Sequence, residues 1–170
     1  MSSLLTPNYL AFIGLCNEYC SAVENAAEKE LSDFVAEMTR ILPRIYISAL
    51  DLPQSDDFGG EIEPAMDEDH YDAVRSSLER LLGAHDTYLE VFEEDMKYSD
   101  TPIAASVSES LADLLQVFYN FIATVRDAPE PVILEALEAV RGDFGDYWSN
   151  VLCNVMRPLN QIRFNATDLE

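Results

Sequence analysis

The chain has 170 residues and a mass of 19.1 kDa, the size of one domain with its own hydrophobic core. Acidic residues outnumber basic ones by 32 to 10, which gives a formal net charge of −22. This balance excludes nucleic-acid binding through clustered Lys and Arg, and adsorption to anionic membranes. We therefore expect a single domain over residues 1–170, with neither a nucleic acid nor a membrane as partner.

The predicted elements begin with a helix that starts at Pro7, with Thr6 as its N-cap. Apolar residues then recur every three or four positions up to Val23, which is the helical period. A second apolar stripe of the same period runs from Leu31 to about Leu50. Pro43 interrupts this stripe, so we expect a kink or a restart there.

Residues 51–66 form the one clear long loop, because they hold two prolines and two glycines. The loop contains five acidic residues and no basic one, and we expect it to be peripheral to the core. One interpretation is a solvated acidic loop. The other is a docking segment for a partner, whose candidate residues are Asp56, Asp57, Phe58, Glu61 and Ile62.

A third helix is predicted to start after Asp67 as N-cap, and its apolar stripe continues to Phe92. Gly83 offers two alternatives within 67–97: the helix ends there and a second one restarts, or one helix carries a mild kink. No segment of the chain shows a convincing alternation of apolar and polar residues, so we expect no β-strand.

The pattern Ser106-Val107-Ser108-Glu109 is a capping box, and it predicts a fourth helix up to Val125. Pro129 and Pro131 open a last helix, which Pro158 closes or kinks. Its glycines, Gly142 and Gly145, would allow a neighbouring helix to approach closely. The chain is thus predicted to be an all-α, antiparallel bundle of five to six helices with one long acidic loop.

Five short motifs recur in a familiar order and spacing along nearly the whole chain. They are Asn17-Glu18-Tyr19-Cys20; Leu42-Pro43-Arg44-Ile45-Tyr46 with Ala49 and Leu52-Pro53; Leu82-Gly83 with Asp86, Tyr88 and Leu89; Ser108-Glu109-Ser110-Leu111-Ala112-Asp113; and Phe144 with Tyr147-Trp148 and Arg157. As a set they resemble a family of uncharacterised, all-α bacterial domains of about this length, widespread in Bacteroidetes-type genomes. The sequence departs from that pattern at Ser149 and at Pro158-Leu159-Asn160. The resemblance implies a fold and no catalytic residues.

Catalytic signatures are weak. No nucleophile motif is present, and the two histidines have simple structural interpretations. His70 lies in the acidic first turn of a helix, and His85 occupies a position of the apolar stripe next to Asp86. The three cysteines, Cys16, Cys20 and Cys153, form no C-x-x-C pair, and we expect them to be buried, reduced thiols. We predict no cofactor and no metal ion.

Two functions from different classes remain open. The first is a non-enzymatic interaction or regulatory module whose acidic surface binds a basic protein partner, or a second copy of the chain. The second is a divalent-metal-dependent hydrolase of a phosphorylated small molecule, similar to the all-α nucleotide pyrophosphatases. It would use Glu90 and Glu93 together with Glu109 and Asp113. All four carboxylates are expected to be solvated, which favours the first function.

The chain begins without a basic leader, and no apolar run approaches 18 residues. We therefore expect a cytoplasmic location.

Overall fold

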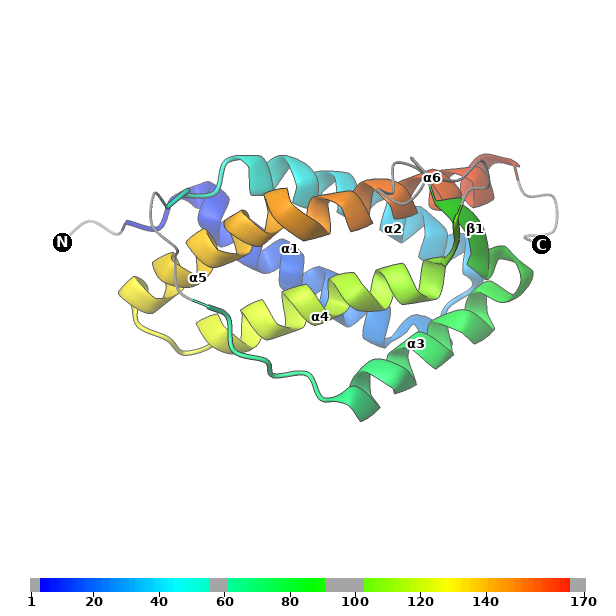
Figure 1. Ribbon diagram of the computed structural model, residues 1–170, viewed down its shortest axis with the longest axis horizontal. Coiled ribbons are helices and arrows are strands. Elements are labelled where there is room, and N and C mark those ends of the chain that lie inside the picture. Colours follow the sequence, from blue (N-terminus) through cyan, green and yellow to red (C-terminus); the bar gives the residue numbers. More distant parts are fainter. Residues whose placement is uncertain (1–3, 56–60, 91–102, 166–170) are drawn as a thin grey trace.

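Four long helices lie side by side in the computed structural model, which describes residues 4–55, 61–90 and 103–165 (Figure 1). They are α1 (Pro7–Glu24), α2 (Leu31–Leu50), α4 (Val107–Val125) and α6 (Ser149–Asn165). Each runs antiparallel to its neighbours, with α1 between α2 and α4, and α6 packed against both of those. Helix α3 (Glu68–Leu82) packs on α4, and α5 (Glu130–Asp143) leads into α6. The predicted all-α bundle is confirmed.

Sequence signals located the helix starts well. Thr6 Oγ1 accepts a hydrogen bond from the Tyr9 N–H at 3.1 Å, and Asp67 Oδ1 accepts one from the His70 N–H at 2.7 Å. Ser106 caps α4 in the same way. Both prolines lie inside helices: α2 continues through Pro43, so the restart expected there as one alternative does not occur, and α6 continues through Pro158. The prediction that Pro158 closes the last helix is therefore wrong.

The helix ends at Gly83, as the first alternative predicted, but the restarted helix of that alternative and the kinked continuation of the other are both wrong up to residue 90, because a short hairpin follows. Gly83 closes α3 with φ 55° and ψ −127°, a conformation that favours glycine. A 3₁₀ turn η2 (Gly83–Asp86) leads into β1 (Thr87–Glu90), which pairs antiparallel with β2 (Ile103–Ser106). Asp86 and Tyr88 are buried while Leu89 is exposed, which is the two-residue period of a strand. Four residues were too few for that period to be visible in the sequence.

The centre of the core is aromatic. Phe12 of α1 packs against Phe121 of α4 with ring centroids 5.5 Å apart, and Tyr19 packs against Phe118 at 5.1 Å. Trp148 closes the cluster from the other side, 5.1 Å from Phe118. All five side chains are fully buried. Burial of such rings accounts for much of the stability of a bundle of this size.

Between α5 and α6 the chain makes a turn of π-helix, η4 (Phe144–Trp148). The Trp148 indole N–H donates to Val140 O at 3.0 Å, a carbonyl that also accepts from the Phe144 N–H, so the indole is held to the last turn of α5. Gly142 precedes this turn and Gly145 lies within it, and both are exposed. An added Cβ would meet nothing within 4 Å at Gly142 and only the Arg141 guanidinium at 3.8 Å at Gly145. The expected close approach of another helix at these glycines is wrong.

The connection 51–66 is anchored at both ends, so the expectation that it is peripheral to the core is wrong there. Leu52 and Met66 are 4% and 7% exposed, and Ile62 packs against the core. The Ala65 and Met66 N–H groups both donate to Asn120 Oδ1 of α4 at 2.9 Å. Asn120 thereby fixes the entry of the chain into α3.

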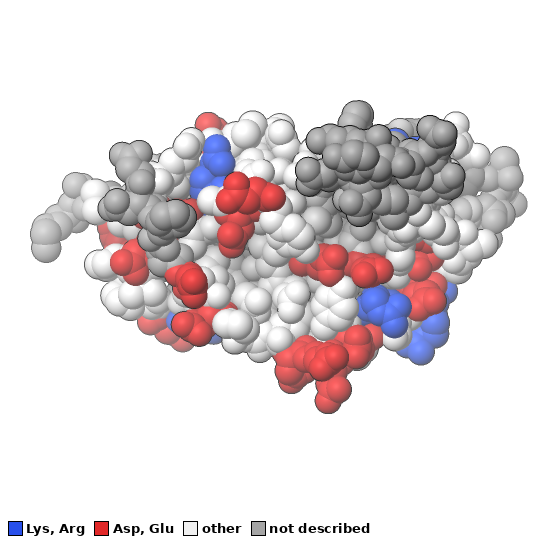
Figure 2. Space-filling view, in the orientation of Figure 1, with Lys and Arg blue, Asp and Glu red and all other residues white. Residues whose placement is uncertain are grey.

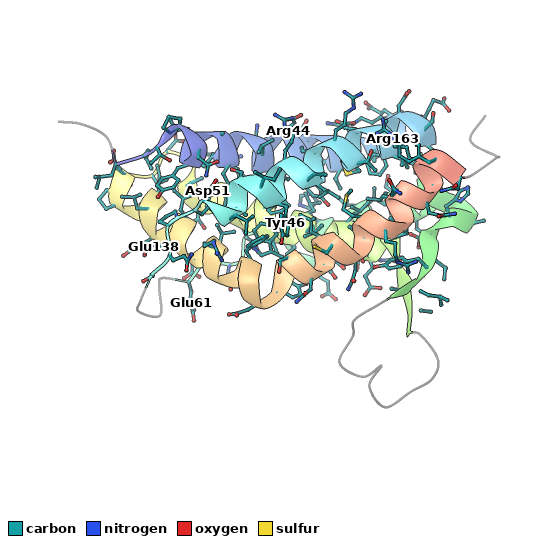
Figure 3. The ribbon with its side chains drawn as sticks, turned by 90° about the horizontal axis from the view of Figure 1, so that it is seen from above. Arg44, Tyr46, Asp51, Glu61, Glu138 and Arg163 are labelled. Carbon is teal, nitrogen blue, oxygen red and sulfur yellow. The ribbon has the colours of Figure 1, made fainter. Side chains whose placement is uncertain are left out.

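At the end of the bundle where α6 finishes and α2 begins, Arg163 of α6 donates to Ala36 O of α2 at 3.1 Å (Figure 3).

In the three described ranges, every helix is too short or too polar to cross a bilayer.

Candidate functional site

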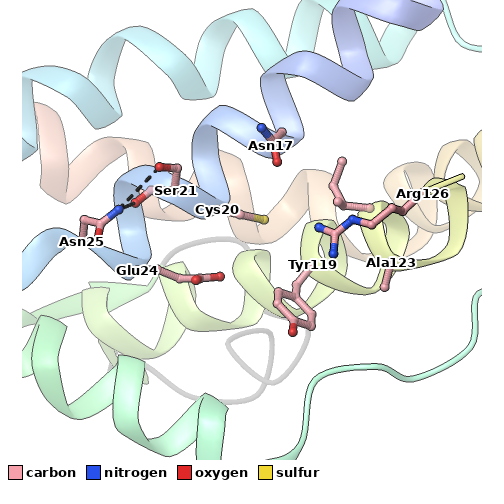
Figure 4. A pocket seen from close by; sticks show the side chains of 9 residues that line it. Asn17, Cys20, Ser21, Glu24, Asn25, Tyr119, Ala123 and Arg126 are labelled. Atoms are coloured by element: carbon pink, nitrogen blue, oxygen red, sulfur yellow. Dashed lines mark hydrogen bonds between the residues drawn. The ribbon is translucent and has the colours of Figure 1, made fainter.

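A pocket of about 270 Å³ lies between the carboxyl-terminal halves of α1 and α4 (Figure 4). Figure 4 shows Glu24 of α1 and Arg126 of α4 on opposite sides of this pocket. Most of its lining is polar or charged. Helix α1 contributes Asn17, Cys20, Ser21, Glu24 and the following Asn25, and α4 contributes Tyr119, Ile122, Ala123 and the following Arg126. A concave site with a few convergent polar groups is the usual form of a ligand site.

One end of this pocket carries a negative charge. Glu24 Oε1 lies 4.0 Å from His70 Nε2 of α3, at the outer limit of an ion pair. The His70 ring in turn packs edge-on against Tyr119, with the ring centroids 5.0 Å apart. Both Glu24 and His70 are about one-third exposed, at 36% and 31% of their side-chain surface. The carboxylate is therefore partly accessible at the edge of the pocket that it lines.

The other end carries a positive charge. Arg126, at the carboxyl end of α4, reaches toward the hollow from the side opposite Glu24 (Figure 4). Within the described part of the chain, its guanidinium makes no ion pair and no hydrogen bond, and neither does the Asn17 side-chain amide. Donors at this end are thus available to an anion.

Cys20 lies between the two charged ends. Burial, with a further contribution from the neighbouring Glu24 carboxylate, raises the pKa of its thiol to about 12. The thiol therefore stays protonated at neutral pH and is a poor nucleophile. Burial likewise raises the pKa of Cys16. The expected buried, reduced thiols are found at these two positions, whereas Cys153 is exposed, so the prediction is wrong there.

A second cluster joins α3, α4 and the π-turn. The Tyr71 hydroxyl donates to Asp113 Oδ1 at 2.6 Å. Burial raises the pKa of the Asp113 carboxyl, and the nearby Glu109 carboxylate raises it further, although the Tyr71 hydrogen bond acts in the opposite direction. The pKa of Tyr147 is raised by burial and by both carboxylates. The expectation that Asp113 is solvated is wrong, because α3 covers this face of α4.

The metal-dependent hydrolase needs four carboxylates around one point. Glu109 is exposed and Asp113 is half-buried, so the two differ in environment although they lie one turn apart. The side chain of Glu90 and the whole of Glu93 lie outside the described residues. Among the residues that are described, no group of three or more His, Cys, Asp or Glu side chains is placed to hold a metal ion.

The candidate docking segment is described only in part. Asp56, Asp57 and Phe58 lie outside the described residues. Glu61 is exposed, whereas Ile62 is half-buried against the core. Docking by this segment stays a prediction.

The family motifs include residues that tie the fold together. Buried Asp86 accepts hydrogen bonds from the Ser108 N–H at 2.7 Å and from the Ser106 hydroxyl at 2.9 Å, which fixes the hairpin to the start of α4. The Tyr19 hydroxyl donates to Leu111 O at 2.7 Å, and Arg157 of α6 donates to Leu89 O. Asn17 and Cys20, which line the pocket, belong to these motifs. Glu24 and Arg126 also line the pocket but lie outside the motifs, and no pattern of residue types in the sequence pointed to them.

The comparisons identify the family. The profile of the family described as a domain of unknown function (DUF5063) matches residues 4–165, so the chain belongs to that family. It is similar to the crystal structure of a Bacteroides fragilis protein determined by a structural genomics consortium, with a TM-score of 0.80 and 26% sequence identity. That match covers 95% of this chain and 96% of the other. No curated protein matches the sequence significantly.

Proposed function

We propose that this chain is a non-enzymatic cytoplasmic module that binds a protein partner with a basic surface. The observation that carries the proposal is the large surplus of acidic side chains without a cation to neutralise them. The chain has 32 acidic residues against 10 Lys and Arg. Figure 2 accordingly shows carboxylates spread over the visible face with few basic side chains between them.

The ion pairs of the described residues neutralise little of this charge. Lys29 lies 2.7 Å from Glu37, and Arg75 lies 3.0 Å from Glu79 within one helix. The Arg44–Glu18 pair spans 4.0 Å between exposed side chains and is correspondingly weak. Asp51, Glu61 and Glu138 lie at one end of the molecule (Figure 3), and none of the three makes an ion pair with another described residue. Complementary charge on a partner would be attracted from a distance and oriented before contact.

A basic partner is favoured over a second copy of the chain, because two molecules of charge −22 repel each other. The free cysteines fit a reducing compartment such as the cytoplasm.

The test uses a synthetic peptide of roughly twelve residues with alternating Lys and Ser, and a matched peptide with Glu in place of Lys. We expect saturable binding of the Lys peptide alone, weakening steeply with added NaCl, and NMR shift changes confined to one face. Sedimentation of the free protein reports self-association. Uniform, non-saturating shifts would contradict the proposal.

The same titration tests the docking segment. Neutralising Asp56, Asp57 and Glu61 to Asn, Asn and Gln removes three charges from that segment. The matched control neutralises three exposed acids on three other elements, Glu28, Asp33 and Asp72. We expect a larger loss of affinity from the first set, and equal losses would place the interaction elsewhere.

Calorimetric titration with Mg²⁺ or Mn²⁺ tests the alternative function, the metal-dependent hydrolase, because only that function needs a stoichiometrically bound ion.

A further inference from the structure

We propose that the α1–α4 pocket binds the carboxyl-terminal end of a peptide that carries a Lys or Arg side chain two residues before its free carboxylate. The inference rests on the proposed function, a protein-binding module, and names the part of the partner that enters the pocket.

The pocket has two anchors of opposite charge that do not pair with each other. Glu24 and Arg126 face the same hollow from opposite ends, and their charged groups are more than the 4.0 Å of an ion pair apart. Glu24 and Asn17 are seven residues apart on α1, as are Tyr119 and Arg126 at its partner α4. Seven residues of helix advance by roughly 10 Å, so the lining of the pocket is long enough to hold charged groups about that far apart at its two ends.

That spacing selects the ligand. A free amino acid holds its ammonium and carboxylate on one carbon, too close to meet both anchors. A simple anion would have to enter a molecule of net charge −22. An extended peptide advances by about 3.3 Å per residue, so two residues before a terminal carboxylate cover about 6.6 Å, and the length of the basic side chain supplies the rest of the distance. A volume of about 270 Å³ takes two or three residues and not a folded element.

Each end offers chemistry suited to its group. Glu24 supplies a carboxylate, and the Tyr119 ring, which lines the same pocket, adds the π-face attraction that organic cations find next to aromatic rings. Arg126 can donate two parallel hydrogen bonds to a carboxylate, and the Asn17 amide adds a third donor. The aliphatic part of the peptide would lie over Ile122 and Ala123.

The experiment measures calorimetric affinity for acetyl-Lys-Ala-Ala with a free carboxylate. Three further peptides differ by one feature each: Gln for Lys, an amidated end, and an internal Asp replacing the terminal carboxylate. We expect the parent peptide to bind at least tenfold more tightly than the first two. Equal binding of the internal-Asp peptide would overturn recognition of a chain end.

Protein variants locate the two contacts. Glu24→Gln should weaken the affinity for the parent peptide at least tenfold and leave the affinity for the Gln peptide unchanged. Arg126→Gln should weaken the affinity for the parent peptide at least tenfold and leave the affinity for the amidated peptide unchanged. Glu28→Gln and Arg80→Gln, both exposed, are matched controls expected to change affinity less than twofold. Thermal unfolding of each variant shows that the fold is kept. If neither pocket variant changes the affinity, the inference is wrong.

The two proposals fail in different ways. If the long Lys peptide binds and the tripeptides do not, the module stands and the pocket assignment falls. If the parent tripeptide binds in the pocket and the long Lys peptide does not, the acidic surface is not the binding element and the proposed function falls in its present form.

Discussion

The carboxyl group of Asp113 shows how one covered side chain changes the energetics of a helix face. Tyr71 of α3 lies over it and donates a hydrogen bond of 2.6 Å. Burial nevertheless raises the carboxyl pKa above its ordinary value of 3.8, so the desolvation of the charge outweighs the hydrogen bond. The charged form is therefore less stable in the folded protein than in water.

Asp113→Asn is accordingly expected to leave stability at pH 7 unchanged or slightly raised, because the amide oxygen still accepts from Tyr71 and the charge is gone. Asp113→Leu removes the acceptor and should cost about 1–2 kcal/mol. The native carboxyl contributes stability that is fully present below pH 3.8 and is lost as pH rises through its elevated folded pKa. Any advantage of the Asn variant in urea unfolding should thus shrink as the pH falls from 7 through the raised pKa of Asp113 toward 3.8. A constant advantage would contradict this.

At the scale of elements, Gly83 determines where α3 ends. Its φ of 55° with ψ of −127° is poorly accessible to residues with a Cβ, although nothing lies within 4 Å of an added Cβ. Gly83→Ala should therefore lower stability by about 1–3 kcal/mol through backbone strain alone. Gly142→Ala is the matched control, since Gly142 is helical and equally open, and there Ala should raise stability by about 0.5–1 kcal/mol. Changes of the same sign in denaturant unfolding would refute the assignment.

Asn120 sets the path of the acidic connection. Its Oδ1 accepts both the Ala65 and the Met66 N–H groups at 2.9 Å. Asn120→Ala leaves both donors without this acceptor and should cost about 1–2 kcal/mol, with faster hydrogen exchange at those two amides. Gln116→Ala, one turn earlier on α4 and exposed, should change neither quantity. Unchanged exchange in the Asn120 variant would show that the connection is held elsewhere.

Helix content was predictable because the helical period repeats over 15 to 20 residues in most of the helices. Caps such as Thr6 and Asp67 were predictable because they act on the backbone three residues away. The β1–β2 hairpin was not, since four residues at Thr87–Glu90 give only two repeats of the strand period. Tyr88 also continued the helical stripe by coincidence.

The pocket was invisible for a different reason. Glu24 and Arg126 are 102 positions apart in sequence, and only the antiparallel packing of α1 on α4 brings them to one hollow. The burial of Asp113 under Tyr71 depends in the same way on where α3 lies. Sequence periodicity indicates which face of its helix a residue occupies. Which other element covers that face depends on the tertiary packing.

At the scale of the whole molecule, the dominant electrostatic feature is self-repulsion. A charge of −22 on a chain of 170 residues is offset in the described part by few close ion pairs, which leaves most carboxylates repelling one another. The Debye length falls from about 30 Å at about 0.01 M salt to about 10 Å at about 0.1 M, so added salt screens repulsion between distant carboxylates first. The short ion pairs at 2.7 and 3.0 Å are weakened too, but they are few.

The melting temperature should therefore rise between about 0.01 and about 0.5 M NaCl, measured by calorimetry at pH 7. Glu28→Lys, which reduces the net charge by two at an exposed site, should raise the melting temperature more at the low-salt end than at the high-salt end. A flat or falling profile would mean that the acids are locally compensated, and it would remove the long-range attraction on which recognition of a basic partner depends.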